Sequence, residues 1–345
     1  VSGLSSICRE LLSERGEAKG TALAREALDR YGELTEDDRR RFFGDLAENF
    51  GPNPTMVDRT YREWRDAPNA KSRQALMSAI EGERQRLFRR LNMAPGGTSA
   101  LVKGRAQLLE ALSAEPLLQA VDDDLRHLLT SWFNRGFLEF HSIGWHTPAQ
   151  VLEKLIAYEA VHAIRGWDDL RRRLASDRRC YAFFHPALPG EPLIFVEIAL
   201  VNGLSAAIGP IIEAPMPATF QAESADTAIF YSISNCQPGL RGISFGNFLI
   251  KQVADELKRD HPALKQFSTL SPVPGFRRWL DGLDTSLLER ALGSDIGTMI
   301  EAMGTDDLAI ARGCLVEAAD EHAIEPTVLR LLQRLCAYYL CELPD

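Results

Sequence analysis

Residues 231–280 read YSISNCQPGLRGISFGNFLIKQVADELKRDHPALKQFSTLSPVPGFRRWL, and this stretch decides the fold of the second half of the chain. Residues 227–234 alternate apolar and small polar side chains, which is typical of a strand. A glycine turn follows at 237–242, and a helical period begins after it. The helix has one apolar stripe at the spacing i, i+3, i+4, i+7, formed by Ile250, Val253, Ala254 and Leu257. We therefore expect a turn held between a strand and a packed helix.

The turn at 237–242 has the composition of an anion site. Gly239 and Gly242 would let the backbone approach a ligand closely, and the free N–H groups of the next helix would point at it. The sequence lacks both the Lys-Ser/Thr ending of a P-loop and the G-x-G-x-x-G spacing of a dinucleotide fold, which argues against ATP, GTP and NAD. The favoured ligand is a pyrophosphate. Taken alone, the same residues also fit an ordinary strand-to-helix turn.

A second short segment, FSTLSPVPGF at 267–276, places two serines beside a proline-rich turn. On a strand, Ser268 and Leu270 share one face and Thr269 takes the other, whereas Ser271 falls at the strand's end. A serine here can serve a reaction, or the Ser-Pro pair can simply cap the helix that begins near Gly275. The residues alone leave both interpretations open.

Composition narrows the class of protein. With 45% hydrophobic residues and no window near the roughly 18 apolar residues of a membrane span, we expect a soluble globular protein without a membrane partner. The net charge is −9 without a basic block, so we expect no nucleic-acid partner. Six cysteines without a C-x-x-C pair indicate reduced thiols in a reducing compartment. We expect a cytoplasmic, bacterial protein. None of the histidines shows a metal-ligand spacing, so we expect no metal: His127, His141, His146, His162, His185, His261 and His322.

The chain divides into two parts that differ in hydrophobic period. Up to about residue 130 it is helical, with expected helices in 5–16, 20–34, 36–50, 72–93 and 99–133. From near Gly136, short aromatic and β-branched runs predict strands in 136–143, 180–186, 192–201, 228–234 and 265–271. Helices are expected between them at 148–162, 168–175 and 246–259, and again after about Asp284. We predict an α+β protein with a helical bundle domain at 1–131 and a mixed-sheet α/β domain at 132–345. The helical domain carries no chemical motif, so we assign it to assembly of a homo-oligomer, a dimer or a tetramer.

These motifs resemble known families. QPGLRG at 237–242 resembles the Q/R-x-x-G-x-G/A pyrophosphate loop of the GNAT acyltransferase superfamily. Four segments together resemble the catalytic domain of the malonyl-CoA decarboxylase family in order and spacing: 146–164, 178–200, 228–234 and 267–276. The resemblance covers roughly residues 130–340, and the helical remainder resembles the family's N-terminal domain in type and length.

The resemblance implies a GNAT-like catalytic domain that converts malonyl-CoA to acetyl-CoA and carbon dioxide without a metal or organic cofactor. Coenzyme A would lie between splayed strands at 227–234 and 265–271. The catalytic serine of the family's F-S-x-L-S-P motif falls on Ser268, with Ser271 second. The coenzyme loop would comprise Gln237, Pro238, Gly239, Leu240, Arg241, Gly242 and Ile243.

One feature of the family has no match here. The family's second catalytic residue is a histidine in an N-P-V-A-N-F-H-like segment, beyond the point where this sequence ends at CAYYLCELPD. Because the sequence also starts at Val1, we expect a longer native chain whose remaining catalytic part supplies this histidine. The alternative is a divergent member without that acid; were the acid within these residues, His322 would be the first candidate. Two rival functions stay open, a GNAT-type acyl-CoA N-acyltransferase and a non-catalytic acyl-CoA-binding protein.

Overall fold

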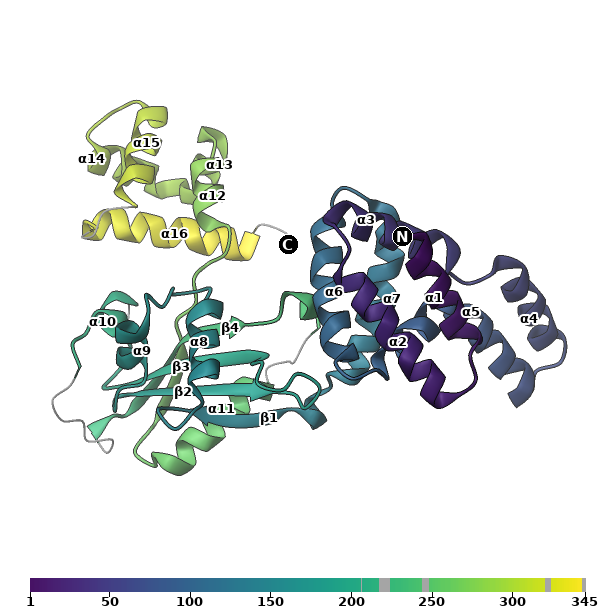
Figure 1. The fold of residues 1–345 in the computed structure, drawn as a ribbon. Helices are drawn as coiled ribbons and strands as arrows, with labels where there is room; N and C mark the ends of the chain where they lie inside the picture. The colour runs from purple at the N-terminus through teal and green to yellow at the C-terminus, as the bar shows by residue number, and fades with distance from the viewer. Residues whose placement is uncertain (206, 217–223, 244–247, 320–323, 343–345) are drawn as a thin grey trace. The chain divides into compact units, whose positions relative to one another are not determined.

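The computed structural model describes residues 1–205, 207–216, 224–243, 248–319 and 324–342. The chain forms two compact units, Val1–Leu270 and Ser271–Asp345 (Figure 1). The first unit holds a group of helices followed by a sheet, and the second holds helices alone. The two units are described separately below.

The first half of the first unit is helical, as predicted. Its elements are α1 (Ser2–Ser13), α2 (Glu17–Gly32), α3 (Glu36–Asn49), α4 (Pro54–Asp66), α5 (Ala70–Asn92), α6 (Gly97–Ala111), η1 (Pro116–Leu118) and α7 (Gln119–Trp132). The core of this helical half includes Leu11, Leu46, Phe50, Leu87 and Leu108.

Two details of the helical half differ from the expectation. The predicted helices leave out α4, of which the structure buries only Thr60. What starts α4 is local, since Asn53 caps the N–H groups of Thr55 and Met56 and Pro54 takes the first helical position. The single run expected at 99–133 is broken between α6 and α7, where Pro116 opens a short 3₁₀ turn.

A five-stranded mixed sheet forms the second half of the first unit. Its strands are β1 (Glu139–Ile143), β2 (Arg178–Phe184), β3 (Ile194–Val201), β4 (Thr227–Asn235) and β5 (Gln266–Thr269), in spatial order β1-β2-β3-β4-β5. The pairs from β1 to β4 are antiparallel, and β4 and β5 are parallel. All five predicted strands are confirmed, and with them the α+β fold class. The connecting elements are η2 (Arg135–Phe137), α8 (Ala149–Tyr158), α9 (Trp167–Arg173), α10 (Gly209–Ile212), η4 (Pro238–Leu240) and α11 (Phe248–Asp260).

Helices cover both faces of the sheet. On one face, Val196 and Phe230 pack with the apolar stripe of α11, where Val253 and Leu257 are fully buried as predicted. Residues of α6 and α7 join this same cluster, so the helical half and the sheet share a core. On the other face, Phe195 and other strand residues pack with α8.

Strands β4 and β5 part from each other midway along β4. Their pairing runs from Thr227 to Phe230 on β4, and the Leu270 N–H makes a last bond to the Phe230 carbonyl at 2.8 Å. The β3–β4 register shifts at the same level, which leaves Tyr231 as an extra residue in β4. Such a bulge bends a strand. From Tyr231 to Asn235, β4 therefore continues with no β5 partner among the described residues.

The second unit is a set of helices with its own core. It contains α12 (Phe276–Asp281), α13 (Thr285–Leu292), η5 (Gly293–Asp295), α14 (Ile296–Met303), α15 (Leu308–Ala318) and α16 (Pro326–Glu342). Their buried side chains include Leu288, Leu292, Met299, Leu315 and Leu335. Among the described helices of both units, none is long and apolar enough to cross a bilayer.

Candidate active site

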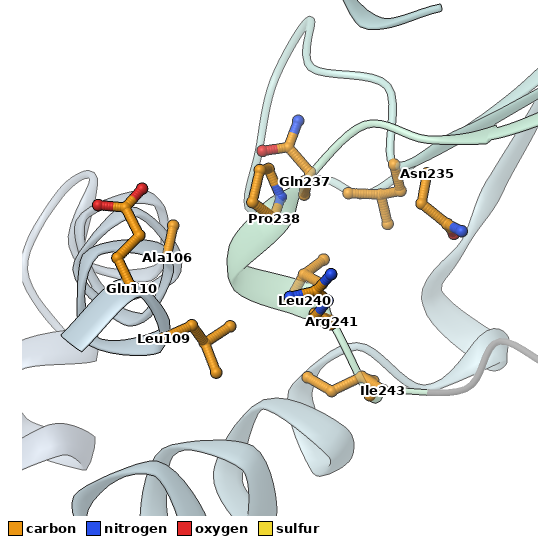
Figure 2. Close-up of a pocket in the computed structure, with 11 residues that line it drawn as sticks. Ala106, Leu109, Glu110, Asn235, Gln237, Pro238, Leu240, Arg241 and Ile243 are labelled. Carbon is orange, nitrogen blue, oxygen red and sulfur yellow. The ribbon is translucent and has the colours of Figure 1, made fainter. Parts of the chain in front are cut away.

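A cavity of about 510 Å³ lies where β4 ends and the glycine turn begins. Figure 2 shows the turn residues on one side and α6 on the other. Six of the seven predicted coenzyme-loop residues line this cavity, and Gly239 does not. The full lining is Ala106, Leu109, Glu110, Leu193, Asn235, Gln237, Pro238, Leu240, Arg241, Gly242 and Ile243.

The turn has a defined backbone conformation. The N–H groups of Leu240, Arg241 and Ile243 donate to carbonyls within the turn at 2.9, 3.1 and 3.0 Å. Gly242 has a positive φ of 77°, which a glycine adopts without strain, and a Cβ added there would meet no heavy atom of the described residues within 4 Å. No backbone acceptor among the described residues takes the Gly242 N–H. Within the described part of the chain, that N–H is therefore unbonded. The residues between the turn and α11, 244–247, lie outside the described residues.

The sequence predicts that Gly239 lets the backbone approach a ligand, but in the structure it lets the turn approach α6. A Cβ there would lie 1.8 Å from the carbonyl oxygen of Val102, so only a glycine lets the turn pack on α6. Aligned on Gln237, moreover, the first glycine of the GNAT pattern falls on Leu240. The close approach that Gly239 permits is to a helix of the same chain, whereas Gly242 is the glycine exposed at the cavity.

Sequence reasoning missed a second contact between the turn and the helical half. Arg105 of α6 donates hydrogen bonds to the carbonyls of Gly239 and Arg241, each at 2.8 Å, and forms an ion pair with Asp122 of α7. The prediction that assigns the helical half to assembly alone leaves out this contact. One signal was present in the sequence, since Arg105 interrupts the buried stripe of Leu101 and Leu108 at helical spacing.

The two candidate serines lie in different units. Ser268 is on β5, half-buried, with Ile229 of β4 as its register partner. No hydrogen bond joins its Oγ to another described residue, and it is not in the lining of the cavity at the turn. Gln237 comes eight positions after Ile229 along the chain, which is roughly 25 Å of extended chain. Ser271 is exposed beyond the end of β5, as expected, and begins the second unit.

Buried charges surround the bulge in β4. Glu197 of β3 accepts a hydrogen bond from Arg173 at 2.8 Å, and the Arg173 guanidinium lies over the Tyr231 ring. Burial raises the pKa of Glu197 to about 8, because the carboxylate is withdrawn from water even with Arg173 beside it. No sequence pattern singled these residues out.

A second buried carboxylate ties α8 to β4. Glu159 accepts hydrogen bonds from Ser232 at 2.7 Å and Ser234 at 3.0 Å, and from the N–H groups of Val161 and His162. All of its partners are neutral donors, which is what a buried carboxylate needs in the absence of a counter-ion. This network holds the part of β4 that has no β5 partner.

The histidines do not gather into a metal site in the described part of the chain. No group of three or more His, Cys, Asp and Glu side chains is arranged there to hold a metal ion. His322 lies outside the described residues.

The comparison with protein families decides the kinship. The model of the malonyl-CoA decarboxylase C-terminal domain matches residues 136–343, and that of the malonyl-CoA decarboxylase N-terminal domain matches residues 50–133. The chain belongs to the malonyl-CoA decarboxylase family. The resemblance read from the sequence is thereby confirmed at family level, while the GNAT superfamily stays a prediction.

Relatives in the family extend from animals to bacteria. The chain is 36% identical over 323 residues to the mitochondrial malonyl-CoA decarboxylase of Anser anser anser, covering 88% of this chain and 64% of the goose protein. It is 34% identical over 355 residues to the mitochondrial enzyme of Rattus norvegicus, covering 95% and 71% of the two chains. The chain thus spans less than two thirds of the length of the goose relative.

Solved structures of the family show the same fold. The malonyl-CoA decarboxylase of Rhodopseudomonas palustris matches with a TM-score of 0.86 at 46% identity, covering all of this chain and 82% of that one. The structure from Agrobacterium vitis matches with a TM-score of 0.82 at 45% identity, covering 98% and 80% of the two chains.

Proposed function

We propose that this protein is a malonyl-CoA decarboxylase, which converts malonyl-CoA to acetyl-CoA and carbon dioxide. The observation that carries the proposal is the match over the whole chain to the Rhodopseudomonas palustris decarboxylase at 46% identity. The loop cavity and the open edge of β4 are consistent with it, because a coenzyme A thioester needs both a phosphate site and an extended groove.

In this proposal the coenzyme lies along β4. Its pyrophosphate occupies the cavity at the turn, where the Gly242 N–H has no backbone acceptor among the described residues and Arg241 is exposed. Its pantetheine arm, which carries amide groups, pairs with the open edge of β4 from Tyr231 to Asn235, as peptides do when they add to a sheet edge. The acyl group then lies toward the point where β4 and β5 part, near Ser268.

The chemistry places clear demands on the site. The bond between Cα and the carboxylate breaks, carbon dioxide leaves, and the electron pair passes to the thioester oxygen as an enolate. A donor aimed at that oxygen is worth roughly 3–4 kcal/mol in the transition state. A proton must then reach Cα, a step to which a positioned acid contributes roughly a hundred- to ten-thousand-fold.

We assign the serine role to Ser268, as a donor to the malonyl carboxylate or to the thioester oxygen, with Ser271 as the second candidate. For the acid we propose the family's histidine; residues 1–345 contain no match to its N-P-V-A-N-F-H-like segment. Neither a metal ion nor an organic cofactor takes part in the proposed reaction.

The proposal includes a homo-oligomer formed through the helical half, in the bacterial cytoplasm. Large apolar side chains stand exposed on α4 and the first part of α5, namely Met56, Tyr61, Met77 and Ile80. If they form the interface, replacing Met77 and Ile80 by glutamate should lower the mass measured by sedimentation equilibrium. An unchanged mass would move the interface elsewhere.

Product analysis tests the function directly. The full-length protein should form acetyl-CoA and carbon dioxide in equal amounts from malonyl-CoA, with a chelator present, and should act poorly on free malonate. An N-acyltransferase would instead release free coenzyme A from acetyl-CoA when amines are added. A binding protein would hold malonyl-CoA without turnover.

A further inference from the structure

The position of the coenzyme loop depends on one arginine from the helical half. Arg105 lies on α6 with only 1% of its surface exposed, and its Nη1 bonds two carbonyls of the turn, those of Gly239 and Arg241. These carbonyls belong to the middle of the 3₁₀ turn and to the residue that follows it. A single buried nitrogen therefore holds the turn at two points, on the side where α6 packs against it (Figure 2).

Asp122 fixes the guanidinium in place. Its two carboxylate oxygens accept from Arg105 Nε at 2.7 Å and Nη2 at 3.3 Å, and it is only 3% exposed. A buried ion pair is favourable only when its remaining donors are also satisfied, and the two loop carbonyls do this. Because Asp122 balances its charge and neither residue lines the cavity, Arg105 is not itself a ligand of the phosphates.

Peptide geometry links Arg105 to the N–H of Gly242, a residue that lines the cavity. In a trans peptide the carbonyl and the N–H point in opposite directions. The carbonyl of Arg241 is held by Arg105, so the N–H of the same peptide unit, which belongs to Gly242, points away from Arg105. We propose that Arg105 is a positioning residue that sets the direction of the Gly242 N–H for the coenzyme pyrophosphate. The inference rests on the proposed function only in naming coenzyme A as the ligand.

The helical half offers a matched control. Arg84 of α5 is 4% exposed and pairs with Asp124 of α7 at 2.6 Å. Its other nitrogens hold the carbonyls of Leu46 and Ala120, at 3.0 and 2.9 Å. Both arginines are thus buried, pair with an aspartate and donate to backbone carbonyls, but Arg84 contacts carbonyls of the helical half and Arg105 contacts carbonyls of the loop.

The test compares Arg105→Lys with Arg84→Lys in the full-length protein. A lysine keeps the charge but cannot make the forked contacts. Arg105→Lys should weaken binding of coenzyme A, measured by calorimetry, by about tenfold, the value of roughly one charged hydrogen bond. It should lower kcat/KM for malonyl-CoA by the same factor and leave malonyl-pantetheine, which lacks the pyrophosphate, within about twofold of wild type. Arg84→Lys should lower the thermal midpoint similarly and change neither ligand measurement.

Several results would overturn the inference. It is wrong if Arg105→Lys binds coenzyme A as tightly as Arg84→Lys does, or if malonyl-pantetheine is affected as much as malonyl-CoA. If Arg105→Lys does not fold, Asp122→Asn tests the inference instead, with Asp124→Asn as its control. Only Asp122→Asn should weaken binding of coenzyme A, by about threefold or more. A wild type that binds coenzyme A but forms no acetyl-CoA would remove the proposed function, and the binding comparison would still test Arg105. A wild type that binds no coenzyme A would remove both.

Discussion

Arg173 of α9 and Glu197 of β3 lie 2.8 Å apart, with both side chains almost completely buried. The pair lies beside the bulge that puts Tyr231 into β4 as an extra residue. The pair thus supports the place where β4 parts from β5. A change in the protonation of Glu197 should therefore change the free energy of unfolding.

We expect stability to depend on pH through Glu197. Burial raises its pKa from the ordinary 4.5 to about 8, so folded Glu197 keeps a proton that the unfolded chain releases between these values. The stabilising contribution is full below pH 4.5 and is lost as pH rises through 8, with a slope of at most about 1.4 kcal/mol per pH unit. Urea unfolding at a series of pH values should show this fall in wild type and a shallower one in Glu197→Gln. Parallel profiles would show that Glu197 is already ionised in the folded protein.

A negative charge at Gly242 should block the coenzyme site. Gly242 has φ of 77°, a conformation that both Asp and Asn tolerate better than other residues. Gly242→Asp should weaken binding of coenzyme A by about tenfold or more relative to Gly242→Asn, because only the carboxylate repels the pyrophosphate. Calorimetry on the two folded variants measures the ratio. Equal affinities would mean that the pyrophosphate does not bind at this turn.

The two serines should differ in their effect on turnover. We expect Ser268→Ala to lower kcat far more than Ser271→Ala, with a smaller change in KM, as for a contact that strengthens in the transition state. Steady-state kinetics on malonyl-CoA give both constants. Should Ser271→Ala be the inactive variant, the assignment within the FSTLSP segment is reversed.

Cysteine reactivity should show whether the coenzyme loop opens near Cys236. Burial raises the pKa of Cys8 to about 12 and also raises the pKa of Cys180 and Cys236, so little thiolate forms at these sites. Cys341 is exposed. Iodoacetamide at pH 8 should therefore modify Cys341 in the native protein and the three buried thiols only after denaturation, as read by peptide mass spectrometry. Fast labelling of Cys236, which precedes Gln237, would show that the loop opens.

Local patterns were enough to predict most of the elements. Each of these elements is defined by residues close together in the chain. Alternating apolar side chains predict β4, the glycines predict the turn, and the apolar stripe predicts α11. The family resemblance likewise came from short contiguous segments. The prediction omits helix α4, whose start depends on capping by Asn53.

The features that the sequence could not predict depend on contacts between residues that are far apart in the chain. Arg105 and Gly239 are 134 positions apart, so the purpose of either residue is visible only once α6 lies against the turn. The bulge at Tyr231 depends on which residues of β3 pair with which residues of β4. The hydrophobic pattern of each strand by itself does not determine this pairing. The Arg173–Glu197 pair also depends on folding, because charged residues are seldom predicted to be buried.

The most direct test of decarboxylation through an enolate is turnover of malonyl-CoA by the full-length protein in deuterium oxide, with a chelator present. The account predicts acetyl-CoA that carries one deuterium in its methyl group, formed in step with carbon dioxide, since Cα receives a proton from an acid that exchanges with solvent. Release of free coenzyme A without acetyl-CoA, or tight binding of malonyl-CoA with no product, would contradict it.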